Sequence, residues 1–470
     1  MPRPRPVTTD HRSPTGPAPA GLGHAMKQRQ LIMMGLGSAI GAGLFLGSGA
    51  GIQAAGPAVL VSYLLAGTLV IIVMWALGEM AAANPSSGAF STYAEKAMGR
   101  TAGATIGWLW WLQLVVVIAA EAVGAAGLLA TIWPVLPVWL LALVFMVVFT
   151  VVNLFGVRNY GEFEFWFAIF KVIAILAFLA VGAALLFGWL PDVPSPGLGV
   201  IFGGDGFAPK GIAGIGAGLL VVIFAFGGTE IVAVAAAETE NPGPSVAKAI
   251  RTVVWRILVF YFGSVLVIAL TVPWDSEALA SPFAAVLSAA QIPGADAAIT
   301  LVAAIALLSA LNANLYGASR MIYSLSERNE APGALRRLSR RRVPVRAVLA
   351  SVAFGFIATV LELIFPERVL PVLLNVVGST CLVVWAMVLL SQLVLRRRAD
   401  RDGTELPFRM RGFPAVTYIG LALLATILVL GFFSPTTGIQ LVSTLALIAG
   451  IAAAAKINAR RNTAKSSSLP

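Results

Sequence analysis

The sequence predicts an all-α, polytopic membrane protein with about twelve transmembrane helices, and three observations lead to this fold class. First, 59% of the 470 residues are hydrophobic and only 11% are charged, more apolar side chain than a soluble chain of this length buries. Second, apolar runs of about 20 residues, the length that crosses a bilayer, recur along almost the whole sequence. Third, basic residues gather in alternate connections between these runs.

The N-terminal segment 1–28 is rich in Pro, Arg and Thr and carries no short apolar core before a small-residue cleavage site. We therefore predict a disordered cytoplasmic tail and not a signal peptide. Both histidines, His11 and His24, lie in this tail, and the single cysteine, Cys381, lies in an apolar run. Because these residues supply no zinc site, no Ser-His pair and no disulfide framework, we expect no metal, no cofactor and no enzymatic activity.

The apolar runs predict membrane spans at 31–54, 58–83, 103–130, 134–156, 163–190, 210–238, 248–272, 297–322, 346–365, 369–394, 414–433 and 437–456. If the N-terminus is cytoplasmic, all but three of the 32 lysines and arginines lie in the tails, the inner loops or the adjoining helix ends. The exceptions are Lys171, Lys210 and Arg368. Both termini are therefore expected in the cytoplasm, and the net charge of +11 indicates topology and not a nucleic-acid partner.

The first span contains "GSAIGAG", which places Gly37, Gly41 and Gly43 near the middle of the bilayer. Glycine frees the backbone to leave helical geometry and lets another group approach it closely. Small residues at four-residue spacing also mark close helix packing in membranes. This stretch alone does not decide between a helix break and a packing face.

The sixth span carries a second interruption, "FAFGGTEIVAV", with Gly227 and Gly228 followed by Thr229 and Glu230. Spans one and six would be the first helices of two five-helix halves, so the interruptions fall at corresponding positions. Such pairs are typical of inverted-repeat transporters whose substrate site lies where the broken helices meet. Freed N–H groups suit a carboxylate and freed carbonyls suit an ammonium, so the pattern favours a small zwitterion.

Six motifs follow one another along the chain: "GLGSAIGAGLFLGSG", "AGPAVLVSYLLAG", "GEMAAANPSSGAFSTYAEKAMGR", "NYGEFEFWFAIFKVIAILAF", "FAFGGTEIVAVAAAETENP" and "LNANLYGASRMIYSLSERNEAP". In these motifs the sequence resembles the bacterial amino acid transporter family of the amino acid, polyamine and organocation superfamily, and it is similar to 4-aminobutyrate and neutral amino acid permeases of that family. The resemblance implies a leucine-transporter-like 5+5 inverted repeat plus two C-terminal helices, proton coupling and amino acid uptake across the bacterial plasma membrane.

With this resemblance the chain divides into five expected segments. After the tail at 1–28 come a transport core at 29–395, a basic cytoplasmic loop at 396–413, two helices at 414–456 and a cytoplasmic tail at 457–470. The core would comprise one repeat at 29–190 and a second at 208–395.

Carried over by motif, the resemblance also implies the substrate contacts. The substrate carboxylate would meet the N–H groups of Ala42 and Gly43 beside Gly41, and relatives with Ser or Thr after Gly41 gain a side-chain contact that Ala42 lacks. The amine would meet the carbonyls of Ala39, Phe224, Ala225 and Gly227, with hydroxyls from Ser38 and Thr229.

Three ionisable residues inside the membrane are candidate proton-coupling groups, because such residues are costly there and are retained for function. Lys171 would lie about 13 Å into its span if that helix begins near Glu162, or it snorkels to the inner surface. In similar sodium-independent relatives a lysine at this position takes the place of a sodium ion. Glu230 is either a proton carrier or a structural acid bound to freed N–H groups, and Glu121 either faces the substrate cavity or braces helices.

Together these features predict a proton-coupled permease that imports a small or neutral amino acid, with 4-aminobutyrate among the candidates. The alternative is an exchanger of the same fold that trades amino acids or amines without proton coupling. A channel is disfavoured because no filter motif repeats, and an enzyme because no catalytic constellation is present. The expected partners are the amino acid, a proton and the lipid bilayer.

Overall fold

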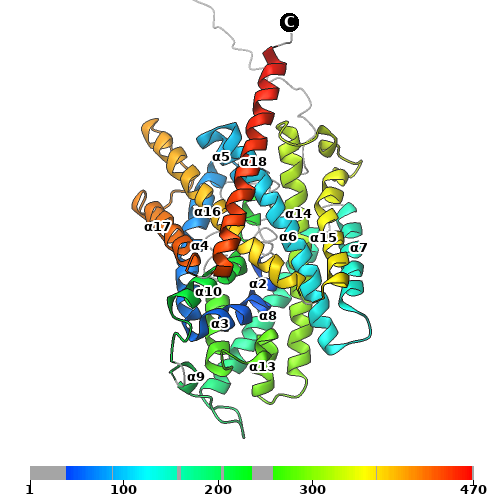
Figure 1. Ribbon diagram of the computed structural model, residues 1–470, viewed down its shortest axis with the longest axis vertical. Helices are drawn as coiled ribbons and strands as arrows, with labels where there is room; N and C mark the ends of the chain where they lie inside the picture. Colours follow the sequence, from blue (N-terminus) through cyan, green and yellow to red (C-terminus); the bar gives the residue numbers. More distant parts are fainter. Residues whose placement is uncertain are drawn as a thin grey trace, which may run out of the picture.

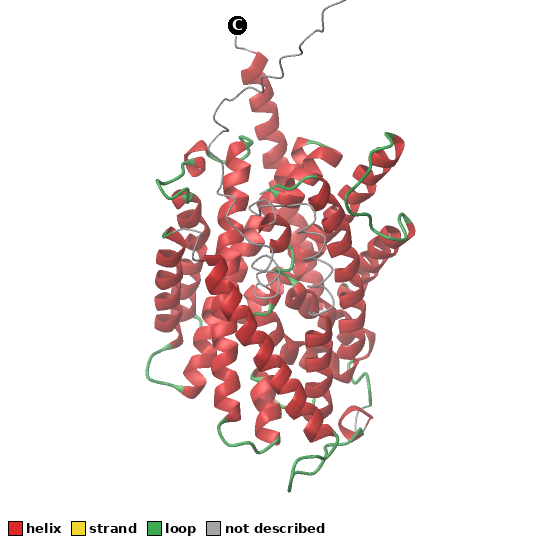
Figure 2. Cartoon of the chain, turned by 180° about the vertical axis from the view of Figure 1, so that it is seen from behind, coloured by secondary structure: helices red, strands yellow, loops and turns green. Residues whose placement is uncertain are grey.

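The computed structural model describes residues 39–86, 88–155, 160–202, 206–235, 258–366, 368–433 and 435–467. These residues form a bundle of helices that run mostly along one axis (Figures 1 and 2), and no strand occurs among them. The predicted all-α class is confirmed. In the same ranges eight helices are long and apolar enough to cross a membrane, and three shorter apolar helices lie at 138–154, 258–271 and 415–431.

The described helices coincide with the predicted spans. In the first half they are α2 (Ala42–Phe45) and α3 (Gly47–Ala55), α4 (Val59–Ala83), α6 (Arg100–Ile132), α7 (Val138–Leu154) and α8 (Tyr160–Leu186). In the second half they are α10 (Gly211–Phe226) and α11 (Ile231–Ala235), the helix at 258–271, α14 (Ala295–Glu327), α15 (Val345–Ile364) and α16 (Val369–Arg401). The last two are α17 (Ala415–Gly431) and α18 (Pro435–Ser467).

Two helices run further than the sequence predicts. Helix α16 continues to Arg401, into the segment predicted as a basic loop, where Arg396 pairs with Asp400 one turn later. Helix α18 continues to Ser467, into the predicted tail, and projects beyond the other helices in Figure 1. Apolar runs locate the membrane layer and not the helix end, because a helix continues into water where its side chains favour it.

Short helices mark the two ends of the bundle. Helix α5 (Ala89–Met98) packs on α6 and α16 at the end from which α18 projects, and α13 (Pro282–Ala289) packs on α8 and α14 at the opposite end (Figure 1). We refer to these as the α5 end and the α13 end. The spacing of Thr92 and Glu95 predicts a capping box at the start of α5. That prediction is wrong, because α5 begins at Ala89 after Gly88 and Thr92 lies inside the helix.

The centre of the bundle is formed by α6 and α14, which pack against each other and are buried along most of their length. The first interrupted helix lies against both, and α3 packs on α10 of the second interrupted helix. By contrast, α7 and α17 expose large apolar side chains such as Val147, Val151 and Ile419. A bundle that exposes large apolar side chains fits the lipid environment expected from the sequence.

Candidate functional site

The first helix break lies at Gly41, which precedes α2 with φ −143° and ψ −147°. The N–H group of Ala42 is therefore not used within a helix. It donates to both carboxylate oxygens of Glu121 in α6, at 3.1 Å and 2.9 Å. A Cβ atom on Gly41 would overlap Oε1 of Glu121, so glycine is required for this approach. The amide that the sequence assigns to the substrate carboxylate is thus held by a carboxylate of the protein.

The second break separates α10 from α11. Gly228 has φ +96°, a left-handed conformation that glycine adopts without strain. Its N–H donates to Oε2 of Glu230 at 2.8 Å, and the indole N–H of Trp385 in α16 donates to Oε1 of the same carboxylate. Glu230 therefore binds a freed N–H group, which is the structural role that the sequence left open.

The two breaks meet in the interior. A Cβ atom on Gly43 would overlap the backbone Cα of Ala225, so the two interrupted segments touch at this point. A cavity of about 10 Å³ lies beside the contact, lined by Ala39, Gly43, Val117, Glu121, Phe224, Ala225, Gly227 and Asn314. This volume holds at most about one water molecule. The described conformation is therefore closed around the site, and the site must open before a substrate can enter.

Polar atoms around this cavity retain unused hydrogen-bonding capacity. Oγ1 of Thr229 and Oδ1 of Asn314 are buried without a hydrogen-bond partner in the described part of the chain. The carbonyl of Ala39 accepts a hydrogen bond from the hydroxyl of Tyr261, and that of Phe224 accepts one from Gly227 N at 3.0 Å. Each carbonyl has a second lone pair for a substrate amine. Ser38, the remaining predicted contact, lies outside the described residues.

A cluster of buried charged groups adjoins the site. Lys171 is 0% exposed in α8, about 16 Å along the helix from Tyr160. Its ammonium interacts electrostatically with the carboxylates of Glu164 and Glu121. Glu164 is also 0% exposed, and Ser309 Oγ lies 2.9 Å from each of its carboxylate oxygens. The charge of Lys171 thus interacts with those of Glu164 and Glu121, while Glu230 contacts Gly228 and Trp385.

Sequence reasoning missed Glu164, Tyr261 and Trp385. A signal for Glu164 exists, because it precedes Lys171 by seven residues and therefore lies on the same helix face. Tyr261 and Trp385 reach the breaks from distant segments, and no local pattern identifies them. For Asn312 and Asn314 the sequence leaves two roles open, substrate binding and helix joining, and favours helix joining. Asn312 does join helices, since its Oδ1 accepts from Asn153 Nδ2 of α7 at 2.7 Å.

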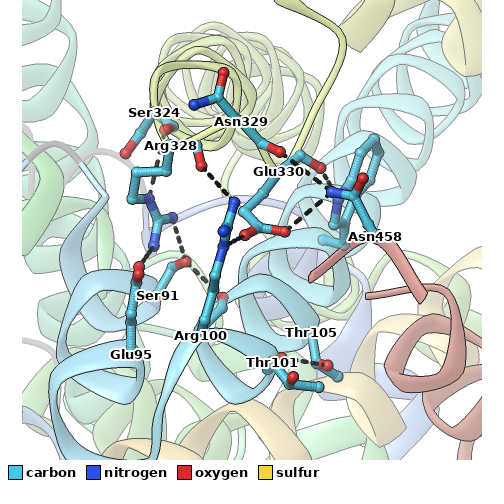
Figure 3. A network of polar contacts seen from close by, with 12 residues as sticks. Ser91, Glu95, Arg100, Thr101, Thr105, Ser324, Arg328, Asn329, Glu330 and Asn458 are labelled. Atoms are coloured by element: carbon cyan, nitrogen blue, oxygen red, sulfur yellow. Dashed lines mark hydrogen bonds and ion pairs between the residues drawn. The ribbon is translucent and has the colours of Figure 1, made fainter. Parts of the chain in front are cut away.

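A polar network closes the α5 end (Figure 3). Arg100 of α6 forms an ion pair with Glu330 after α14, and Arg328 forms one of 2.6 Å with Glu95 of α5. Asn458 of α18 donates to the Asn329 carbonyl at 3.2 Å and to Glu330 Oε2 at 3.3 Å. The network joins α5, α6, α18 and the segment that follows α14.

A smaller set of contacts bridges the α13 end. Lys210 donates to the carbonyl of Gln53 at 2.7 Å and lies 5.2 Å from the ring centre of Trp274. The amide of Gln53 donates in turn to the Ser276 carbonyl at 3.4 Å. The buried site is therefore separated from both ends of the bundle by polar contacts between helices.

Two interrupted helices that meet at a closed site in the middle of a many-helix bundle define this protein as a multi-pass membrane transporter. Comparison with known proteins specifies the class further. The family model described as amino acid permease matches residues 30–468, and the chain belongs to that family.

Three similar proteins are named for the transport of either aromatic amino acids or gamma-aminobutyric acid. The chain is 47% identical to the aromatic amino acid transport protein AroP of Corynebacterium glutamicum, over 87% of this chain and 89% of that protein. It is 44% identical to the gamma-aminobutyric acid permease of Bacillus subtilis, over 87% and 88%. It is 40% identical to that of Escherichia coli, over 94% and 95%. These relatives are permeases, and the predicted resemblance is confirmed.

Proposed function

We propose that this chain is a proton-coupled permease that imports a neutral amino acid across the bacterial plasma membrane by alternating access. The observation that carries the proposal is the hydrogen bond between the Ala42 N–H and Glu121, beside the contact of Gly43 with Ala225. It brings a titratable carboxylate to the amide that is suited to the substrate carboxylate. Relatives named for aromatic amino acid transport and for gamma-aminobutyric acid support the amino acid class.

In this proposal two carboxylates compete for one amide. A substrate carboxylate reaches the Ala42 N–H only when Glu121 leaves it, and a protonated Glu121 is the weaker acceptor. Proton uptake by Glu121 therefore favours substrate binding. It also removes a negative charge that interacts with Lys171 and so favours proton release by the lysine. The substrate amine would lie near the Ala39 and Ala225 carbonyls and the unpaired Asn314 Oδ1.

The substrate side chain is expected to be uncharged. An anionic side chain would be repelled by the carboxylates near the site. The names of the relatives suggest two neutral candidates, an aromatic amino acid and 4-aminobutyrate. A Cβ atom at Gly227 would lie 3.1 Å from the Phe224 carbonyl oxygen and 3.3 Å from Cys381 Sγ, so a larger residue here would crowd the site that either ligand must enter.

The decisive experiment uses the purified full chain in liposomes with an inward proton gradient. We expect a neutral amino acid, found by screening the twenty amino acids and 4-aminobutyrate, to accumulate above its external concentration and to leak out after a protonophore is added. Uptake that ignores the gradient and requires preloaded internal substrate would instead establish the exchanger.

The proposed orientation places the α5 end in the cytoplasm. In the described part of the chain this end carries most basic residues, whereas the α13 end carries Lys210 and Arg368. In a Cys381→Ser background, a cysteine at Asp296 should react with an impermeant thiol reagent outside intact cells, and one at Arg340 should not. The reverse pattern would invert the orientation.

A further inference from the structure

A second cavity lies between α7, α8 and α14, and it shares no lining residue with the cavity beside the helix breaks. Its volume is about 110 Å³, and Glu164, Ser309 and Asn312 supply its polar lining. The remaining lining comes from apolar side chains of the same three helices. Such a volume holds about three to four water molecules at roughly 30 Å³ each, and a buried carboxylate with polar neighbours is the setting in which water is ordered.

Glu164 connects this cavity to the buried lysine. Lys171 follows it by seven residues on the same face of α8, with an axial separation of about 10.5 Å between the Cα atoms. Helical side chains lean toward the N-terminus, so the long lysine side chain extends back toward Glu164 and shortens that gap. The electrostatic interaction between the two groups agrees with this arrangement.

The cavity lies on the α5 side of Lys171. Phe178, further along α8, packs on Phe283 of α13, so the chain runs from the α5 end through Glu164 and Lys171 toward the α13 end. Asn153, which donates to Asn312 at the cavity, lies near the end of α7, where Arg341 from the basic α14–α15 connection stacks on Phe155.

We propose that Glu164 is the second proton site of the transport cycle and passes the proton from Lys171 to water on the α5 side. The proposal rests on the proton coupling proposed above. The Lys171 ammonium gives one proton to a Glu164 carboxylate oxygen, which leaves a neutral amine and a neutral carboxylic acid. The acid then gives that proton to water in the cavity and returns to a carboxylate. In the described part of the chain, the groups around Glu164 are Lys171 on α8 and the uncharged Ser309 and Asn312.

This assignment gives each carboxylate beside Lys171 a different task. Glu121 faces the substrate site through the Ala42 N–H, whereas Glu164 faces a polar cavity that the substrate site does not share. A proton that enters with substrate at Glu121 therefore has an exit toward the α5 end that does not recross the substrate site.

The test compares two transport modes of Glu164→Gln in liposomes. Counterflow exchange of labelled for unlabelled substrate requires no net proton release, whereas accumulation under an inward proton gradient does. We expect counterflow within about twofold of the parent and accumulation reduced at least about tenfold, a bound set below the about 100-fold or larger rate effect typical of a lost proton-transfer group. Glu164→Asp should restore part of the accumulation. The control is Glu362→Gln, a buried carboxylate in α15, which should keep both modes.

A second variant tests the water. Leu308 lines the cavity, and Leu308→Phe should displace its water and slow accumulation more than counterflow. If Glu164→Gln loses both modes, the proposal stands only if Glu164→Asp recovers counterflow and Leu308→Phe shows the selective loss. Parental accumulation by Glu164→Gln would overturn it and leave proton coupling intact. A parent protein that ignores the proton gradient would instead overturn the proposed coupling, whatever Glu164 does.

Discussion

The buried charge cluster around Lys171 and the network at the α5 end contain the same kinds of side chain in different surroundings. Lys171, Glu164 and Glu121 are at most 3% exposed, so each charge depends on its neighbours for compensation. In the α5-end network the side chains of Arg100 and Glu95 are 36% and 32% exposed, whereas their partners Glu330 and Arg328 are 2% and 19% exposed, so water shares the charge of one member of each pair.

The difference indicates separate tasks. Removing one member of a buried set leaves charges that nothing else compensates, so those groups respond strongly to protonation. Partly exposed ion pairs contribute about 1 kcal/mol or less, so they suit a gate that must open in every cycle. We therefore expect large effects from changes at the centre and small effects from changes at the α5 end.

The largest effect is expected at the contact between the two breaks. In Gly43→Val the new Cβ would overlap the backbone of Ala225, which cannot move aside as a flexible side chain does. Uptake in cells should fall below about 1% of the parent, since small displacements in a site cost about 100-fold. The control is Gly127→Val, where a Cβ meets no atom within 4 Å. Normal uptake by Gly43→Val at normal expression would return "GSAIGAG" to the packing interpretation.

Next in size is Lys171→Ala, which leaves Glu121 and Glu164 without the cation whose charge interacts with both. Accumulation driven by a proton gradient in liposomes should fall at least about tenfold, while substrate still shifts the melting temperature, because the proposed substrate contacts lie on other helices. Lys456→Ala removes an exposed cation of α18 and should leave accumulation unchanged. If Lys171→Ala accumulates substrate as the parent does, Lys171 is a structural cation and Glu121 becomes the leading proton site.

The sequence predicted the fold more completely than the site, for a physical reason. A bilayer requires long apolar helices, so composition alone locates the spans, and glycine pairs locate the breaks. The contacts of Tyr261 with Ala39 and of Trp385 with Glu230 join segments far apart in the chain. They depend on how helices rotate against one another, which no local pattern records. Glu164 is an intermediate case, because its spacing from Lys171 was available and its cavity was not.

A smaller effect is expected from Arg100→Ala. This change removes the ion pair with Glu330 and the donation to the Arg328 carbonyl at 3.2 Å. The single cysteine, Cys381, is buried beside the second break and reports opening of the bundle. A thiol reagent applied from the α5 side should modify it about threefold faster, since a pair with one partly exposed member contributes on the order of 1 kcal/mol. The control is Arg346→Ala, which removes an exposed arginine in the first turn of α15. In this variant Cys381 should be modified at the parental rate. A change above tenfold would move this pair into the class of the buried cluster.

The smallest effect is expected from Asn458→Ala, which tests whether α18 belongs to the gate. Its two hydrogen bonds, to the Asn329 carbonyl at 3.2 Å and to Glu330 at 3.3 Å, are long, and water replaces them at an exposed position. A net loss of about 0.5 kcal/mol or less corresponds to a less than about twofold change in Cys381 modification and in uptake. In Asn458→Ala, Arg100 still compensates the charge of Glu330. The double variant Asn458→Ala with Arg100→Ala should therefore change the free energy of opening by more than the sum of the two single changes. If Asn458→Ala alone opens the α5 end more than Arg100→Ala does, α18 is the main closure of the gate, and partial exposure does not predict which contacts hold it shut.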